Sequence, residues 1–241
     1  MAKIADAEEL VNWFPLDAEV TPGKGGSVSL AWGEFWKGTS AIEVWEPNRR
    51  LRTVERRTDG AGRVVEIAVD YFIEGQGGDT VLRVVHSGFG PGAEWDEEFD
   101  SIGRGWKLEL RNLRHYLARH RGTPRRVAWG WAKTSLPAEQ CYARLMGPAG
   151  LVREGSVAGL REGDPYRVVA ATGDVFQGVV ITNDPPRDFA GTVAALNDGI
   201  VRFWAEVGTA SIWISTWGVG ESIVRGLDLR WQDQVRKALE V

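Results

Sequence analysis

The stretch Thr80–Leu117 reads TVLRVVHSGFGPGAEWDEEFDSIGRGWKLELRNLRHYL, and it decides the fold. Its β-branched run 81–85 predicts a strand, which the glycines and proline of 88–92 end. A helix is expected over 101–120, because its apolar residues recur three or four positions apart, the spacing of one helix face. These residues are Ile102, Trp106, Leu110, Leu113 and Leu117. The pattern therefore predicts a last strand followed by a helix that closes a domain.

Between the predicted strand and helix lies an acidic segment, 94–100, which we expect to form a loop. Its carboxylates would complement the dipole at the start of the helix, a more ordinary role than acid–base catalysis or cation binding. Trp95 and Phe99 are expected to pin this loop onto the domain.

Four short motifs follow one another here: His-Ser-Gly-Phe at 86–89, Glu-Trp-Asp at 94–96, Gly-Trp at 105–106 and Leu-x-x-Leu at 110–113. This ordered set resembles the end of a START-like (SRPBCC) domain, in the branch named after activators of the heat-shock-protein-90 ATPase. The resemblance implies an α+β helix-grip fold, in which a curved antiparallel sheet wraps a long C-terminal helix. It also implies an apolar cavity between the sheet and the helix.

The chain also contains an internal repeat. Trp45-Glu46-Pro47 corresponds to Asn183-Asp184-Pro185, and the apolar and glycine pattern of 82–90 recurs over 212–220. The matches keep their order along the chain while their separation changes slowly, as insertions in loops would produce. We therefore expect two tandem START-like domains, at 1–120 and 126–241, joined by a linker at 121–125.

The repeat is not complete at its start. The second copy has a predicted strand and half a helix, 126–142, for which the first copy has no counterpart. The resemblance places that strand beside the last strand, here 81–85, so its absence would leave unpaired backbone groups at a sheet edge. Either the chain is a truncated gene product, or another segment fills the place. A partner chain could supply it by strand addition, which would make a homodimer.

Composition narrows the class of protein. The chain has 241 residues, of which 43% are hydrophobic and 26% charged, as in globular proteins with an ordinary core. Its net charge of −4 and its scattered basic residues argue against nucleic acid as a partner. The first residues contain no apolar run of the kind a signal peptide has, so we expect none, and no apolar run in the sequence is long enough for a membrane span. The single cysteine, Cys141, fits a cytoplasmic location.

Motifs for cofactors, metals and catalysis were sought and not found. The sequence has no phosphate loop, no zinc-ligand spacing and no nucleophile elbow. We therefore expect no cofactor, no metal and no catalytic constellation. His86, at the end of the predicted last strand, could act as a general base. The more ordinary expectation is a strand-end histidine whose ring is hydrogen-bonded to a loop carbonyl.

Large aromatic residues on predicted strands and closing helices are the candidate ligand contacts. They are Trp32, Trp45, Tyr71, Trp106, Tyr166, Phe176, Phe203, Trp213 and Trp231, with Trp36 as a further candidate. The leading hypothesis is a protein that binds a small apolar molecule between sheet and helix, in particular in the complete second copy. Core packing without a ligand would give the same signature.

Two other functions remain open at this point. A cyclase or dehydratase using the same cavity would need convergent polar groups, with His86, Asp70, Tyr71 and Tyr166 as candidates. Asp70 and Tyr71 are neighbours on a strand, so at most one of them faces the cavity. The third class is an interaction protein, similar to the chaperone-ATPase activators.

Overall fold

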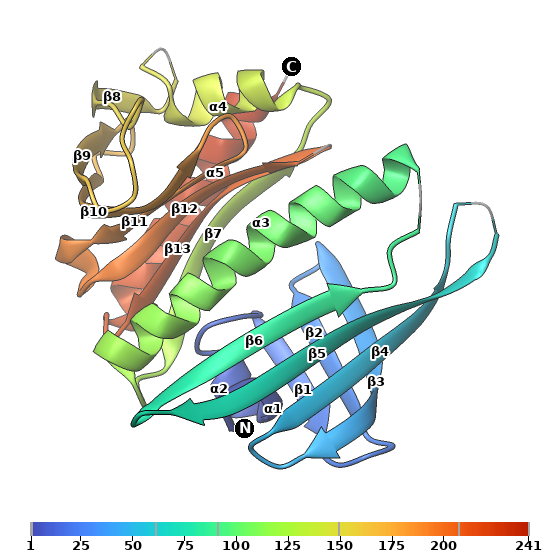
Figure 1. Cartoon of the computed structure of the whole chain (residues 1–241). Coiled ribbons are helices and arrows are strands. Elements are labelled where there is room, and N and C mark those ends of the chain that lie inside the picture. Colours follow the sequence, from blue (N-terminus) through green and yellow to red (C-terminus); the bar gives the residue numbers. More distant parts are fainter. Residues whose placement is uncertain (1, 61, 91, 149, 207, 241) are drawn as a thin grey trace. The chain divides into compact units, whose positions relative to one another are not determined.

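The computed structural model describes residues 2–60, 62–90, 92–148, 150–206 and 208–240 (Figure 1). The chain divides into two compact units, Met1–Leu113 and Arg114–Val241. The sequence-based linker at 121–125 stays a prediction. Among the described residues, no helix has the length and hydropathy that a membrane crossing requires.

The first unit is a six-stranded antiparallel sheet whose strands are neighbours in chain order. Two short helices precede the sheet, and one long helix follows it. The elements are α1 (Ala2–Ala5), α2 (Ala7–Leu10), β1 (Asp17–Thr21), β2 (Ser27–Trp32), β3 (Trp36–Glu46), β4 (Arg50–Thr58), β5 (Val64–Gln76), β6 (Asp79–Ser87) and α3 (Ala93–His115).

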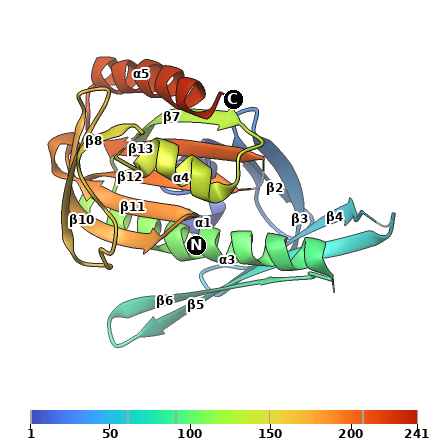
Figure 2. The ribbon, with the colours of Figure 1, turned by 90° about the horizontal axis from the view of Figure 1, so that it is seen from above.

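The second unit is a seven-stranded antiparallel sheet in the order β7-β13-β12-β11-β10-β9-β8. Figure 2 shows the last helix lying over β7. The elements are a π-helical turn (Tyr116–His120), β7 (Arg125–Lys133), α4 (Ala138–Met146), β8 (Val152–Gly155), β9 (Pro165–Ala170), β10 (Val175–Asp184), β11 (Asp188–Val193), a 3₁₀ turn (Ala194–Leu196), β12 (Gly199–Glu206), β13 (Thr209–Trp217) and α5 (Glu221–Leu239).

The two units repeat the same local irregularities. Pairing of β3 with β4 shifts register between Ile42 and Val44, and pairing of β10 with β11 shifts at the corresponding Val180 and Thr182. The Gly25 N–H donates to the Ile42 carbonyl at 2.9 Å, and the Gly163 N–H donates to the Val180 carbonyl at 2.9 Å. These shared details confirm the predicted repeat. Each unit is an antiparallel sheet with a long helix after its last strand, which confirms the α+β helix-grip fold.

The units differ at one edge of the sheet. In the second unit, β13 is paired with β12 on one side and with β7 on the other. In the part of the first unit that the structure describes, the equivalent strand β6 is paired with β5 alone. The absence of a strand on the outer side of β6 among the described residues agrees with the expectation from the repeat, and the incompleteness of the first copy stays a prediction.

The start of α3 corrects the sequence-based prediction. The acidic segment 94–100, expected to be a loop, forms the first turns of α3, which begins at Ala93. Carboxylates are favourable at this end of a helix because they oppose the positive end of its dipole. Trp95 is 3% exposed and anchors these turns as expected, whereas Phe99 is 61% exposed. The side chain of Glu94 lies outside the described residues.

Candidate ligand-binding site

A series of aromatic rings connects the sheet of the first unit with α3. The ring of Trp106, on α3, lies 5.3 Å from that of Phe14 and 5.8 Å from that of Tyr71, on β5. Phe14 in turn lies 5.1 Å from Trp32, on β2, and Trp32 lies 5.4 Å from Trp36. Three of the predicted candidates are therefore brought together, and Phe14 is added to them.

This series of rings is open to solvent along part of its length. Tyr71 is buried, while Phe14, Trp32 and Trp106 are only partly buried and Trp36 is 43% exposed. Ring contacts at 5 to 6 Å are favourable beyond the area they bury, so the series is a stable apolar surface. We call Phe14, Trp32, Tyr71 and Trp106 the ring cluster.

His86 lies at the polar end of the ring cluster. The Trp106 indole N–H donates a hydrogen bond to His86 Nδ1 at 3.1 Å, so the neutral ring carries its proton on Nε2. This Nε2 is buried, and it has no hydrogen-bond partner. The expected loop-carbonyl partner of His86 is thus replaced by an indole from the closing helix. His86 also packs against Phe89, with ring centroids 5.1 Å apart.

Burial lowers the pKa of His86 to about 4. The Glu98 carboxylate acts in the opposite direction and the Arg57 guanidinium reinforces the decrease. Arg57 reaches Glu98 at 2.6 Å and its guanidinium lies 5.4 Å from the centre of the Trp95 ring. His86 is therefore neutral at physiological pH and offers one N–H donor.

The lowered pKa of His86 predicts a loss of stability in acid. Between pH 6.5 and about 4 the unfolded chain binds a proton at this ring and the folded chain does not, so stability falls as pH falls through that range. The decrease in the free energy of unfolding that is due to His86 approaches about 3 kcal/mol near pH 4, because each tenfold difference in proton affinity between the folded and unfolded states corresponds to about 1.4 kcal/mol. Unfolding in urea at pH 7, 6, 5 and 4 measures it.

The matched variant for this measurement is His86→Gln, whose amide oxygen can still accept the indole N–H. Its unfolding free energy is expected to depend less steeply on pH between 6.5 and 4. Burial also lowers the pKa of His115 and of His120, so a residual dependence is expected in the variant. An unchanged slope in His86→Gln would contradict the assignment.

Asp70 and Tyr71 lie on opposite faces of the sheet, as strand alternation predicts. Tyr71 contacts Trp106 of the closing helix. Asp70, 5% exposed, accepts hydrogen bonds on the other face from Arg50 at 2.7 Å and from Arg52. Asp70 is therefore part of an ion-pair network on the face of the sheet opposite the ring cluster.

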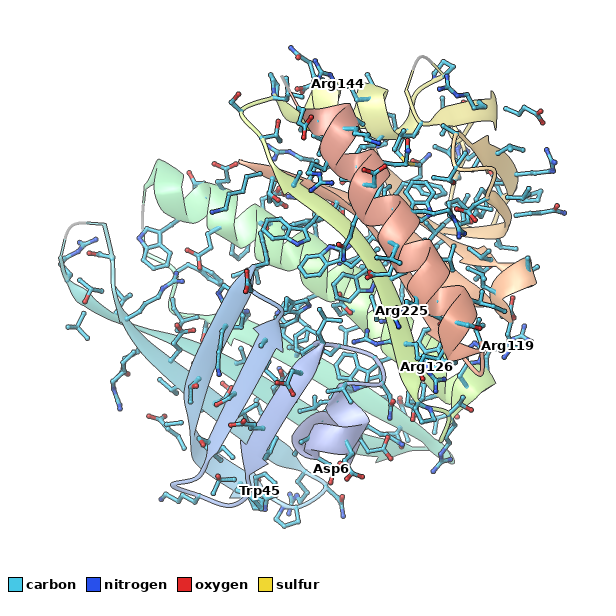
Figure 3. The ribbon with its side chains drawn as sticks, turned by 180° about the vertical axis from the view of Figure 1, so that it is seen from behind. Asp6, Trp45, Arg119, Arg126, Arg144 and Arg225 are labelled. Carbon is cyan, nitrogen blue, oxygen red and sulfur yellow. The ribbon has the colours of Figure 1, made fainter. Side chains whose placement is uncertain are left out.

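Trp45 is separate from the ring cluster. It lies on β3 opposite Leu51, is partly buried, and has no ring contact among the described residues. Trp45 is the second-last residue of β3, and Figure 3 shows it at one end of the strands of the first sheet. Trp45 is thus a predicted ligand contact of the first unit that does not lie with Trp32, Tyr71 and Trp106 in the ring cluster.

The second unit encloses a small apolar cavity. Its volume is about 20 Å³, enough for one water molecule and far below the 300 Å³ or more of typical ligand pockets. Its walls are made only of apolar side chains from α4, α5 and the sheet. The lining residues are Leu145, Met146, Leu151, Val152, Val168, Ala170, Phe176, Phe189, Val201, Phe203, Ile212 and Trp231.

Three predicted candidates line this cavity, and two do not. Phe176, Phe203 and Trp231 lie on its wall and are at most 5% exposed. Tyr166 is buried beside it and donates from its hydroxyl to the Thr192 carbonyl at 2.8 Å. Trp213 lies on the opposite face of the sheet, since it alternates with the buried Ile212 and Ile214, and packs 5.0 Å from the ring of Trp129.

The tight packing of the second unit depends on β7. A Cβ on Gly130 would come within 2.3 Å of the Trp231 carbonyl oxygen, so the missing side chain lets α5 approach the strand. The backbone N–H of Trp129 also donates a hydrogen bond to the Asp228 carboxylate of α5 at 2.8 Å. In the first unit, which lacks an equivalent of β7, α3 is held to the sheet through side chains such as Trp106.

Residues 2–118 match the model of the family described as "Activator of Hsp90 ATPase homolog 1-like protein". The sequence of the first unit is therefore similar to that of this family. The match confirms the resemblance expected from the motifs of 86–113, and the repeated fold extends the same architecture to the second unit. No curated protein matches this chain.

Several solved structures are similar to this chain at low sequence identity. The di-domain ARO/CYC protein BexL is 18% identical, with a TM-score of 0.43, and the match covers 100% of this chain and 93% of BexL. A putative protein of the dynemicin biosynthetic locus is 18% identical, with a TM-score of 0.40 and coverage of 99% and 89%. A protein of Mesorhizobium loti is 18% identical, with a TM-score of 0.44 and coverage of 49% and 86%.

The site holds no arrangement typical of a metal centre. Among the described residues, no group of three or more His, Cys, Asp or Glu side chains is placed to hold a metal ion. Sequence reasoning missed Phe14 and Phe89, both of which lie in irregular segments next to a proline or a glycine. Such residues have no periodic pattern that would reveal which way they face.

Proposed function

We propose that the first unit binds a small apolar molecule containing a ring, held between its sheet and α3. The observation that carries the proposal is the ring cluster: four aromatic side chains in contact, three of them partly exposed, which come from the sheet, from α3 and from the segment before β1. Aromatic surfaces of this kind bind flat apolar molecules by stacking and by burial of apolar area.

The contrast between the two units supports this location. The second unit fills the equivalent space with its own side chains and leaves about 20 Å³. The first unit lacks the strand that draws the closing helix onto the sheet in the second unit. A ligand in the first unit can therefore bury apolar surface that the second unit buries by itself.

The polar end of the site favours a ligand with one hydrogen-bond acceptor. His86 Nε2 is buried without a partner, and such a donor is costly unless a ligand or water satisfies it. Since burial keeps the ring neutral, the donor is compatible with an uncharged oxygen such as a carbonyl.

The proposal is tested with the fluorescent probe 1-anilinonaphthalene-8-sulfonate. We expect saturable binding of about one probe molecule per chain. Trp32→Ser is expected to weaken binding about tenfold, since it removes a ring worth roughly 1–2 kcal/mol of contact. The matched control is Trp45→Ser, which changes a partly buried tryptophan of the same sheet outside the ring cluster and should leave affinity unchanged.

Near-ultraviolet circular dichroism of both variants must match that of the parent protein, because exposed cores of partly unfolded proteins also bind this probe. Equal affinities for the parent and Trp32→Ser would contradict a site at the ring cluster. Loss of binding in Trp45→Ser alone would move the site to the end of β3 that carries Trp45.

A further inference from the structure

In the part of the first unit that the structure describes, no strand pairs with the outer edge of β6, and this edge is regular. Its nine residues pair with β5 without any register shift. They include no proline and no glycine, and Val81 and Val85 are 42% and 37% exposed. Proteins normally protect a free edge with short strands, bulges, prolines or covering elements, because unpaired N–H and C=O groups template further pairing.

The other three sheet edges of this protein are protected in such ways. β1 has five residues and is flanked by Pro15 and Pro22. β8 has four residues and contains a register shift. β7 is covered by α5, to which it is joined by the hydrogen bond between Trp129 and Asp228. The edge of β6 is the exception.

The second unit shows what occupies the equivalent edge. Strand β13, Thr209–Trp217, corresponds residue by residue to β6, Asp79–Ser87, and pairs antiparallel with all nine residues of β7. Opposite Ile214 and Ile212 stand Ala128 and Gly130, which let α5 pass close to the strand. The corresponding residues of β6 are Val84 and Leu82.

Burial supports the same conclusion. Ile212 and Ile214 are 2% and 0% exposed beneath the helix and β7. Leu82 and Val84 occupy the same positions and are only partly buried. Within the described part of the first unit, the unpaired side of β6 therefore leaves apolar side chains, as well as backbone groups, incompletely covered.

We propose that the edge of β6 is a docking site for an extended peptide segment with the chemistry of β7. The segment adds antiparallel along Asp79–Ser87, and its residues opposite Leu82 and Val84 are small, so that it fits beneath α3. Main-chain hydrogen bonds supply most of the affinity, and the small side chains supply the selectivity.

The probe is a labelled peptide with the sequence of β7, RRVAWGWAK, added to the full chain. We expect saturable binding by fluorescence anisotropy, and slower hydrogen exchange in 79–87 with no change in 209–217. A control peptide, RRVLWLWAK, has the same charges and higher strand propensity but bulky residues at the two small positions. It is expected to bind at least about tenfold more weakly, a difference of 1.4 kcal/mol.

Three results would overturn the proposal. The two peptides could bind equally well, which would indicate attraction by charge or apolar character alone. Protection could appear at 17–21 or 152–155, which would place the peptide on another edge. Finally, 79–87 could already be protected in a concentration-dependent dimer without peptide, which would make a second copy of the chain the occupant of the edge.

Discussion

Replacing Trp231 with alanine is expected to lower the free energy of unfolding of the second unit by about 3–5 kcal/mol, the usual cost of truncating a large buried aromatic residue. Trp231 is 2% exposed, lines the small cavity and packs 5.5 Å from the ring of Phe176. Its indole N–H also donates to Asp174 at 3.0 Å, a hydrogen bond that the variant loses. The core around it is already close-packed, so the space left behind cannot easily be refilled.

Trp106→Ala is the matched variant, because Trp106 occupies the corresponding position in the first unit. Trp106 is only partly buried, so its truncation is expected to cost less, about 1–3 kcal/mol. Differential scanning calorimetry resolves the unfolding transitions of the two units where their transition temperatures differ. We expect each variant to lower the transition temperature of one unit, with the larger decrease for Trp231→Ala. Equal decreases in the two variants would contradict the contrast between an open first unit and a packed second unit.

Replacing Asp70 with alanine is expected to lower the stability of the first unit by about 3 kcal/mol, since it leaves two arginines without their shared partner. Asp70 is 5% exposed and accepts hydrogen bonds from both Arg50 and Arg52, which are about one-third exposed. The partial exposure of the arginines places the expected cost at the lower end of the range for buried pairs.

Glu66→Ala is the control for Asp70→Ala. Glu66 forms an ion pair with Arg56 at 2.7 Å on the same sheet, but both side chains are more than half exposed. Its removal is expected to cost less than about 1 kcal/mol, as for most surface pairs. Urea unfolding of the two variants gives the comparison. Equal small effects would show that the Asp70 network contributes little to the fold.

Several elements could be predicted from the sequence because their signals are local. The β-branched and apolar run after the glycine-rich turn predicts a strand over 27–32, and apolar residues four positions apart predict a closing helix over 221–239; the structure has both elements with these bounds. The sequence Asn197-Asp198-Gly199 is typical of a hairpin turn, and Asn197 and Asp198 both have the positive φ that such a turn requires. The repeat was visible because insertions fall in loops while the apolar pattern of strands and closing helices is retained.

Other features could not be predicted, for physical reasons. β1 and β8 are short edge strands, which depend on backbone pairing with one neighbour more than on an apolar pattern. Counting aromatic residues could not reveal which unit is packed, because that depends on how closely a helix approaches its sheet, and in the second unit on Gly130. The face of the sheet on which Trp213 lies could have been predicted from the sequence, because Trp213 alternates with Ile212 and Ile214 along the strand.

Both proposals depend on the claim that two copies of one fold differ by a single strand, so that the first is open and the second closed. Hydrogen exchange of the free protein tests this claim most directly, through the equivalent strands 79–87 and 209–217. We predict exchange about 100-fold faster in 79–87, because openings of an edge strand cost less free energy than those of a strand paired on both sides. Equally slow exchange in the two strands at every protein concentration would contradict the claim.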